Sequence, residues 1–184
     1  KVADAINAKY NHTHIIPVKV DGNLIGDGLQ GKLDAYTAIS RLIRTDSARQ
    51  DSRTVNIIGE KWGGSHTEKG ISGLYSLLDS LGIAINCRYL TDTSTESIIQ
   101  FNSASLNLPS SRDDSMESIC RILSPLSNIP YLDHPLPTGF TETRTWLTAL
   151  GEFFGAEEMV SHLVAQAEME YTSKIEHLKP GLEG

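Results

Sequence analysis

The stretch TVNIIGEKWGGSH, residues 54–66, decides the fold class of this chain. Its first half is a mostly apolar run, typical of a buried parallel strand, and the run ends at Gly59. Two more glycines and a histidine follow, and a helix is expected to begin close to Thr67. In open α/β sheets, ligands bind where a strand enters such a loop. The stretch therefore raises the question of which ligand, if any, its loop holds.

The residues after this stretch complete a βαβ unit. Leucine and isoleucine recur at helical spacing from Ile71 to Leu81, and Gly82 is a typical helix stop. The apolar segment IAINCRYL, residues 83–90, then predicts a second strand. A strand, a helix and a strand in this order form a right-handed crossover between parallel strands.

Further segments extend this pattern in both directions. Ser94 or Thr95 is expected to cap a short helix within residues 91–102. We predict an α/β fold, namely a doubly wound, Rossmann-like parallel sheet of about four strands, with helices on both faces and a C-terminal helical segment. The strands of this sheet are expected at 54–59, 83–90, 104–108 and 129–132, and an earlier strand is expected at 14–20. A glycine-rich loop is expected at 22–31. The other helices are expected at 2–9, 31–43, 111–126, the end of 136–155, and 156–178.

Three parts are expected along the chain. Residues 1–45 form a lead-in helix, strand, glycine-rich loop and helix from an adjoining domain, and 54–155 form the central Rossmann-like domain. Residues 156–184 form a C-terminal helix and tail. Because the chain begins without Met, inside what reads as the end of a helix, we expect a fragment of a longer protein.

The composition is that of an ordinary globular protein, since 39% of the 184 residues are hydrophobic and 21% are charged. The net charge of -7 argues against a nucleic-acid partner, which requires a basic surface. No apolar stretch approaches the roughly eighteen residues of a membrane helix, and the sequence starts without a signal-peptide core. Cys87 and Cys120 lack metal-site spacing, so we expect two buried free thiols in a cytoplasmic chain.

The loop 59–66 lacks two well-known phosphate-binding fingerprints. It matches neither GxGxxG nor GxxxxGK followed by Ser or Thr, so dinucleotide and P-loop interpretations have no motif behind them. Its glycines either let the backbone approach an anion at the next helix or simply make a tight connection. The loops expected at the same edge of the sheet are 21–31, 59–66, 109–115 and 133–141.

Side chains in these loops have both functional and structural interpretations. His66 is either a ligand or a surface residue that caps the next helix. The pair Asp133-His134 has acid–base chemistry, but neighbouring residues in a strand point to opposite faces. Arg112 is either an anion contact or a solvated side chain beside a helix that Ser110 or Ser111 caps.

A family resemblance rests on four stretches, taken in their order and spacing: IIPVKVDGNLIGDGLQGKLDAYTAI (15–39), TVNIIGE (54–60) with LLDSLGI (77–83), SMESICRILSPLSNIPYLDHPLPTGFTETRTWLTALGEFFG (115–155), and the trailing acidic helix. With these stretches, the chain resembles the middle part of nitrogenase component 1 type oxidoreductase subunits. That family includes nitrogenase molybdenum-iron protein subunits, their cofactor-assembly scaffold chains, and dark-operative protochlorophyllide reductase subunits. The layout is most similar to the α-type chains.

The resemblance implies a protein of three α/β domains, with a metallocluster or a tetrapyrrole-type substrate bound between them. It also implies a paired homologous subunit and an ATP-dependent iron-sulfur reductase that supplies electrons for a small-molecule substrate. This chain would be the middle domain, inactive in isolation, and the iron-sulfur or related metallocluster would belong to the full-length parent, with none held by this fragment alone. The residues expected to line the cofactor site are Lys61, Trp62, His66, Arg112, Ser115 and Gly139, with no metal ligand among them.

The chain departs from the family pattern at one important position. Where α-type nitrogenase chains carry a cysteine that ligates the cofactor, the alignment on Ser115 places Arg112. Cys120 falls further along the helix, at a packing position. An arginine suits an anionic ligand, such as a carboxylated tetrapyrrole or an organic acid, better than a metal. The alternatives are a non-catalytic scaffold or carrier for cofactor assembly, and an unrelated α/β domain that binds a small molecule.

Overall fold

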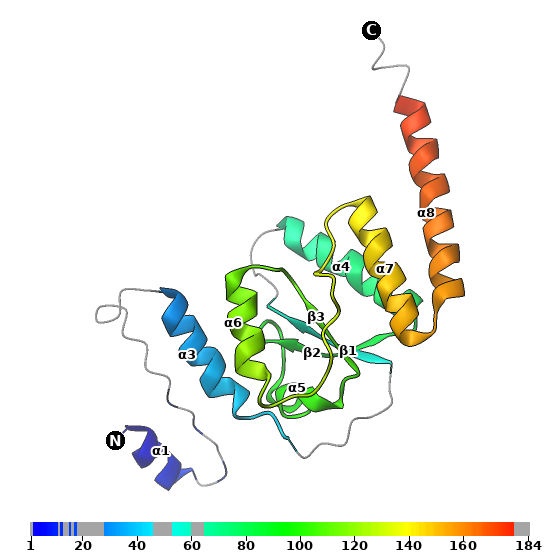
Figure 1. Cartoon of the computed structure of the whole chain (residues 1–184). Helices are drawn as coiled ribbons and strands as arrows, with labels where there is room; N and C mark the ends of the chain where they lie inside the picture. The colour runs from blue at the N-terminus through cyan, green and yellow to red at the C-terminus, as the bar shows by residue number, and fades with distance from the viewer. Residues whose placement is uncertain are drawn as a thin grey trace. The chain divides into compact units, whose positions relative to one another are not determined.

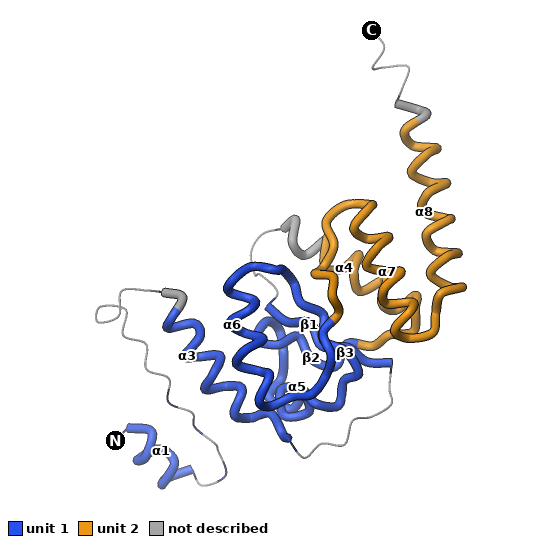
Figure 2. The backbone as a smooth tube through the Cα atoms, viewed as in Figure 1, with its two compact units in different colours: residues 1–62, 85–131 blue, residues 63–84, 132–184 orange. Residues whose placement is uncertain are grey.

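The computed structural model describes residues 2–10, 12, 15, 17, 28–45, 53–59 and 65–178. The chain falls into two compact units (Figure 2). Unit 1 comprises Lys1–Trp62 and Ile85–Tyr131, and unit 2 comprises Gly63–Ala84 and Leu132–Gly184. Each unit contains its own set of buried apolar side chains.

Unit 1 is built around a three-stranded parallel sheet (Figure 1). Its strands are β1 (Thr54–Ile58), β2 (Ala84–Tyr89) and β3 (Leu106–Pro109), in the spatial order β2-β1-β3. β1 and β3 pair in parallel, with Val55 opposite Leu106. All of β3 is buried, as is β1 from Val55 onward, which is why both segments are mostly apolar. The predicted α/β fold class is confirmed.

The sheet has three strands rather than the four or so that we expected. In place of a strand at 129–132, the structure has one isolated parallel bridge between Asn107 and Tyr131. The amide of Asn107 donates to the carbonyl of Pro130 at 2.9 Å, but proline has no N–H with which to continue the ladder. The strand expected at 14–20 lies largely outside the described residues.

Unit 1 also contains helices, the first of which has no buried residue. α1 (Val2–Lys9) and α3 (Gly28–Ser40) come first, and α3 begins inside the segment expected to be a glycine-rich loop. α5 (Thr95–Ile99) and the 3-10 helix η1 (Phe101–Ser103) follow β2, and α6 (Asp114–Leu123) follows β3 and packs against α3. The core that these elements share includes Ile58, Tyr89, Phe101, Met116, Ile119 and Leu123.

The start of α5 confirms one predicted cap. The Ser94 hydroxyl accepts a hydrogen bond of 3.1 Å from the amide of Ser97. This bond satisfies one of the amide groups that the first turn of a helix leaves without a partner.

Asparagine side chains connect the three strands inside unit 1. The Asn56 amide nitrogen donates to Asn107 Oδ1 at 2.9 Å, and the Asn86 amide nitrogen donates to Asn56 Oδ1 at 2.8 Å. Asn56 also donates to the carbonyl of Phe101 at 3.0 Å. Asn56 and Asn107 are fully buried, so these bonds replace the water that the amides lose on folding.

Unit 2 contains α4 (Ser65–Ser80), α7 (Phe140–Phe154) and α8 (Glu157–Leu178). α4 ends as predicted, with Gly82 at a positive φ of 65°. α7 and α8 form a helical hairpin whose tight turn is at Gly155, φ 62°. α8 corresponds closely to the predicted helix 156–178. The buried apolar residues of unit 2 include Leu74, Leu78, Leu81, Trp146, Leu150 and Val160.

Candidate functional site

The strand order of the sheet marks one edge as a binding position. From β1 the chain crosses to β2 on one side, and from β2 it crosses back to β3 on the other side. In open parallel sheets of this kind, ligands bind beyond the carboxyl ends of the two strands at which the direction reverses. Those strands are β1 and β3, so the candidate site lies where they end, at Gly59 and Ser110.

Two hydrogen bonds hold these strand ends together. The Ser110 hydroxyl donates to the carbonyl of Gly59 at 2.6 Å, and the Ser110 amide donates to the carbonyl of Ile58 at 2.9 Å. Gly59 has a positive φ of 74°, and a Cβ atom at this position would collide with the methyl group of Met116. The glycine therefore leaves room for Met116 of α6, in addition to allowing its own positive φ.

The beginning of α6 faces the same edge and carries its own carboxylates. Asp113 Oδ1 accepts a hydrogen bond of 2.9 Å from the amide of Met116, so Asp113 caps the helix. The expectation that Ser110 or Ser111 caps it is wrong, because α6 begins later than predicted, at Asp114. Asp113, and Asp114 and Glu117 in the first turn, already complement the positive end of the helix dipole.

The structure brings two of the predicted site residues together. Arg112 is exposed immediately before α6, and Ser115 is half-buried in its first turn, so both belong to the edge at which β3 ends. His66 lies in α4 of unit 2 and Gly139 precedes α7 of the same unit. Lys61 and Trp62 lie outside the described residues.

Gly139 has a structural role at the start of α7. Its φ of 85° is a backbone conformation that residues with a Cβ rarely adopt. Its carbonyl accepts hydrogen bonds from the Thr143 amide at 3.1 Å and the Thr143 hydroxyl at 2.8 Å. Glu142 accepts bonds of 2.8 Å from both the amide and the hydroxyl of Thr138. These bonds lower the pKa of the Glu142 carboxyl group, because they stabilise its charged form.

The burial of the two cysteines decides whether their thiols suit a metallocluster. Cys87 is buried, 3.5 Å from the hydroxyl of Thr93, and Cys120 is only half-buried on α6, contrary to the expectation that both thiols are buried. Burial raises the pKa of each thiol and so favours the neutral form, whereas a metal ligand must be a thiolate. Within the described ranges, no three His, Cys, Asp or Glu side chains are grouped as metal ligands would be. The residues at this edge do not fit a cluster held by thiolates.

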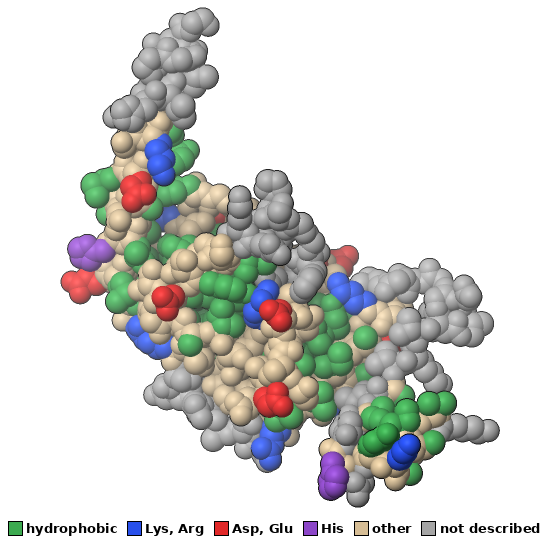
Figure 3. Space-filling model, turned by 180° about the vertical axis from the view of Figure 1, so that it is seen from behind, with side chains coloured by type: hydrophobic (Ala, Val, Ile, Leu, Met, Phe, Trp, Pro, Cys, Tyr) green, Lys and Arg blue, Asp and Glu red, His purple; other side chains and the backbone are tan. Residues whose placement is uncertain are grey.

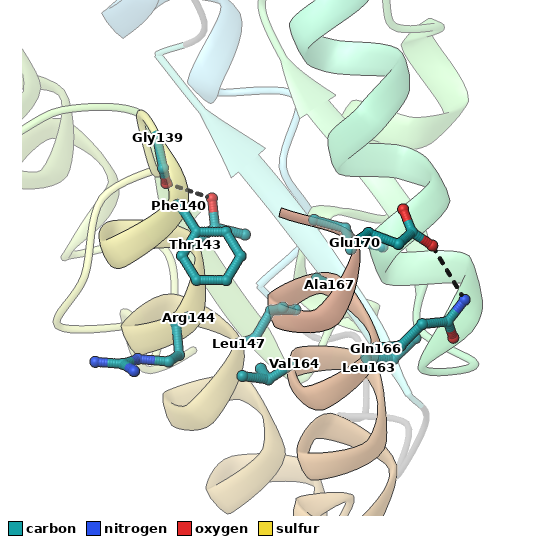
Figure 4. Close-up of a pocket in the computed structure, with 11 residues that line it drawn as sticks. Gly139, Phe140, Thr143, Arg144, Leu147, Leu163, Val164, Gln166, Ala167 and Glu170 are labelled. Carbon is teal, nitrogen blue, oxygen red and sulfur yellow. Dashed lines mark hydrogen bonds between the residues drawn. The ribbon is translucent and has the colours of Figure 1, made fainter. Parts of the chain in front are cut away.

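Unit 2 contains a cavity that was not anticipated from the sequence. It has a volume of about 400 Å³, lies between α7 and α8, and is drawn in Figure 4. Gly139 forms part of its wall, and Leu77 of α4 contributes from a third helix. Its leucine and valine residues recur at the spacing of ordinary core positions, so periodicity alone gave no signal of a cavity.

The surface chemistry agrees with the charge of the chain. On the face shown in Figure 3, the described basic and acidic side chains are scattered rather than gathered into a basic stripe. Among the parts of the chain that the structure describes, no helix has the length and apolar character needed to cross a membrane.

A family model described as nitrogenase component 1 type oxidoreductase matches residues 1–184, which is the whole chain. No curated protein matches the chain.

Proposed function

Because the chain belongs to the nitrogenase component 1 type oxidoreductase family, we propose that it is a domain of an enzyme that receives electrons from an ATP-dependent iron-sulfur reductase and passes them to a bound small-molecule substrate. The observation that carries this proposal is the family match over the full length of the chain. The α/β sheet, with its point of reversal between β1 and β3, supplies the kind of edge at which such a substrate binds.

The proposed setting is a longer cytoplasmic protein in which this chain is the middle of three α/β domains. In that setting, residues 54–155 are the central domain, 1–45 lead in from the adjoining domain, and 156–184 lead out. The protein pairs with a homologous subunit. The metallocluster or tetrapyrrole-type group lies between domains, and the iron-sulfur cluster is held by residues outside this chain.

Arg112 and Ser115 are the described residues best placed to contact the substrate. Both lie in the segment that follows β3, where Arg112 is an exposed residue and Ser115 is in the first turn of α6. A guanidinium group binds a carboxylate through two parallel hydrogen bonds, so Arg112 is proposed as the electrostatic anchor of an anionic substrate. The full proposed lining is Lys61, Trp62, His66, Arg112, Ser115 and Gly139.

A second candidate function is a carrier or scaffold for cofactor assembly, which holds its cargo without electron transfer. One observation favours it. Cys120 lies within α6, its thiol pKa is raised by burial, and Arg112 precedes that helix at the strand end. A domain of this kind can bind an anionic precursor without ligating a metal through sulfur.

The decisive experiment uses the full-length protein, purified without oxygen. We expect several irons and acid-labile sulfides per chain, together with substrate reduction that requires the reductase partner and ATP. A protein that folds and pairs normally but contains no iron would contradict the oxidoreductase proposal and favour the carrier.

The role of Arg112 is tested with a matched pair of variants. An anchor that binds the substrate equally in the ground state and the transition state contributes to KM but not to kcat. Arg112→Ala should therefore raise KM for an anionic substrate with little change in kcat. Arg121→Ala is the control, because Arg121 is an exposed arginine of the same segment that pairs with Glu117 at 3.3 Å. Equal kinetics for the two variants would argue against Arg112 as the anchor.

A further inference from the structure

The cavity in unit 2 is bounded by two helix–helix contacts. At one end α7 and α8 approach so closely that a Cβ atom on Gly151 would lie 2.9 Å from the Val160 side chain. At the other end the rings of Phe140 and Tyr171 stack, with centroids 5.2 Å apart and planes inclined by 12°. The lining residues of α7 and α8 all lie between these two contacts or at Phe140 itself.

The wall of the cavity is mainly apolar. Figure 4 shows side chains of both helices directed into the space between them. The apolar lining residues are Leu77, Phe140, Leu147, Leu163, Val164 and Ala167. The space is open to solvent on one side, since Gly139, Ala167 and Glu170 of its lining are exposed, whereas Leu147 at its base is buried.

The polar groups of the lining are engaged with each other or with neighbours. Arg144 forms an ion pair of 3.3 Å with Glu168, and the Gln166 amide donates to Glu170 at 3.4 Å. Arg144 and Glu170 are the charged residues of the lining, and Glu168, which does not line the cavity, already pairs with Arg144, so no uncompensated cation among these groups favours an anionic ligand.

One lining hydroxyl has hydrogen-bonding capacity left. Thr143 donates its hydroxyl hydrogen to the carbonyl of Gly139 at 2.8 Å. A hydroxyl group that has donated still offers lone pairs as acceptors. A ligand with one N–H or O–H group can use this acceptor, and the stacked Phe140 and Tyr171 rings offer aromatic contacts.

We propose that this cavity binds a small, neutral aromatic molecule that carries a single hydrogen-bond donor, and that Thr143 accepts that hydrogen bond. The size and apolar wall favour an aromatic body, the engaged Arg144 offers a carboxylate no free cation, and the Thr143 oxygen orients the donor. Sites between helices with few convergent polar groups are typical of small-molecule binding.

The first test uses indole as the probe and the intact chain labelled with nitrogen-15. Saturable shifts of the backbone amide signals of Thr143, Leu147 and Val164 are expected. Ala167→Leu places a larger side chain in the wall and should weaken indole binding by about tenfold or more. Ala165→Leu is the matched control, because Ala165 is exposed on the same helix outside the cavity lining, and it should bind like the parent. No saturable shift in the parent, or equal binding by the two variants, would overturn the proposal.

The second test separates the hydrogen bond from the apolar contact. Thr143→Val keeps the shape of the side chain but removes the acceptor, so it should weaken indole binding severalfold and leave toluene binding unchanged. Benzoate should not bind to the parent. Equal losses of affinity for indole and toluene would show that Thr143 does not accept the proposed hydrogen bond. Benzoate binding as tight as that of indole would contradict the proposal that the ligand is neutral.

Discussion

The hydroxyl of Ser110 and the carbonyl of Gly59 are joined by a hydrogen bond of 2.6 Å, which ties the end of β3 to the end of β1. The two residues are far apart in the chain, yet they define the point of the sheet where its direction of winding reverses. Together with the bond from the Ser110 amide to the carbonyl of Ile58, this contact fixes the backbone where the two strands end.

Gly59→Ala should destabilise the protein by about 1–3 kcal/mol, because the residue has a positive φ and its added methyl group would displace Met116. Urea unfolding measures the change as a shift in the midpoint. Gly73→Ala is the control, since a Cβ there meets nothing within 4 Å and the helix gains roughly 0.5–1 kcal/mol. Destabilisation of similar size at both positions would show that the conformation of Gly59 is not the cause.

Asp113→Ala should cost about 0.5–2 kcal/mol, because it removes the cap of α6. Asp113→Asn should retain most of the stability, since the amide oxygen can accept the same bond from the Met116 amide. Ser111→Ala, at the position expected from the sequence, should change the free energy of unfolding by less than about 0.5 kcal/mol. A larger effect of Ser111→Ala than of Asp113→Ala would contradict the capping seen in the structure.

Asn56→Leu should destabilise unit 1 by about 1–3 kcal/mol, because it leaves Asn107 Oδ1 buried without the donor that it has at 2.9 Å. The double variant Asn56→Leu, Asn107→Leu removes both partners. It should therefore be more stable than the sum of the two single changes predicts, by about 0.5–3 kcal/mol. A double-mutant cycle by urea unfolding measures this interaction energy between the two side chains. Strict additivity of the two single changes would show that the amides do not interact.

The Glu142 carboxyl group should titrate below its ordinary value of 4.5, since its charged form accepts two hydrogen bonds from Thr138. A depressed pKa in the folded state adds stability that is present above the ordinary pKa and is lost as the pH falls through the lowered one. The melting temperature of Glu142→Gln should therefore lie below that of the parent at pH 7, and the difference should shrink in acid. Carbon-13 titration of the carboxyl group measures the pKa directly, and a value at or above 4.5 would contradict the assignment.

Local patterns were enough to identify most of the elements. The apolar runs of β1 and β3, the helical spacing in α4, and the cap at Ser94 are all properties of neighbouring residues. Period and capping are determined within a few residues of each position, so the sequence shows them directly. The family resemblance was also readable, because it depends on the order of such segments.

Contacts between distant segments were not readable in this way. The expected strand at 129–132 became a single bridge, because Pro130 has no N–H for a ladder. The cap of α6 is Asp113 and not Ser110 or Ser111, because its carboxylate accepts the hydrogen bond from the Met116 amide. In both cases the element depends on a specific backbone hydrogen bond, which hydrophobic pattern alone does not reveal.

The sequence by itself determined the α/β class, most of the strands and helices, and the positions of Arg112 and Ser115 after a strand, because hydrophobic period and turn residues act locally. Only the tertiary structure decided the strand order β2-β1-β3, the asparagine contacts between strands, and the cavity between α7 and α8. These features depend on which surfaces pack against each other. The free energy of that packing is distributed over contacts between residues that are far apart in the chain.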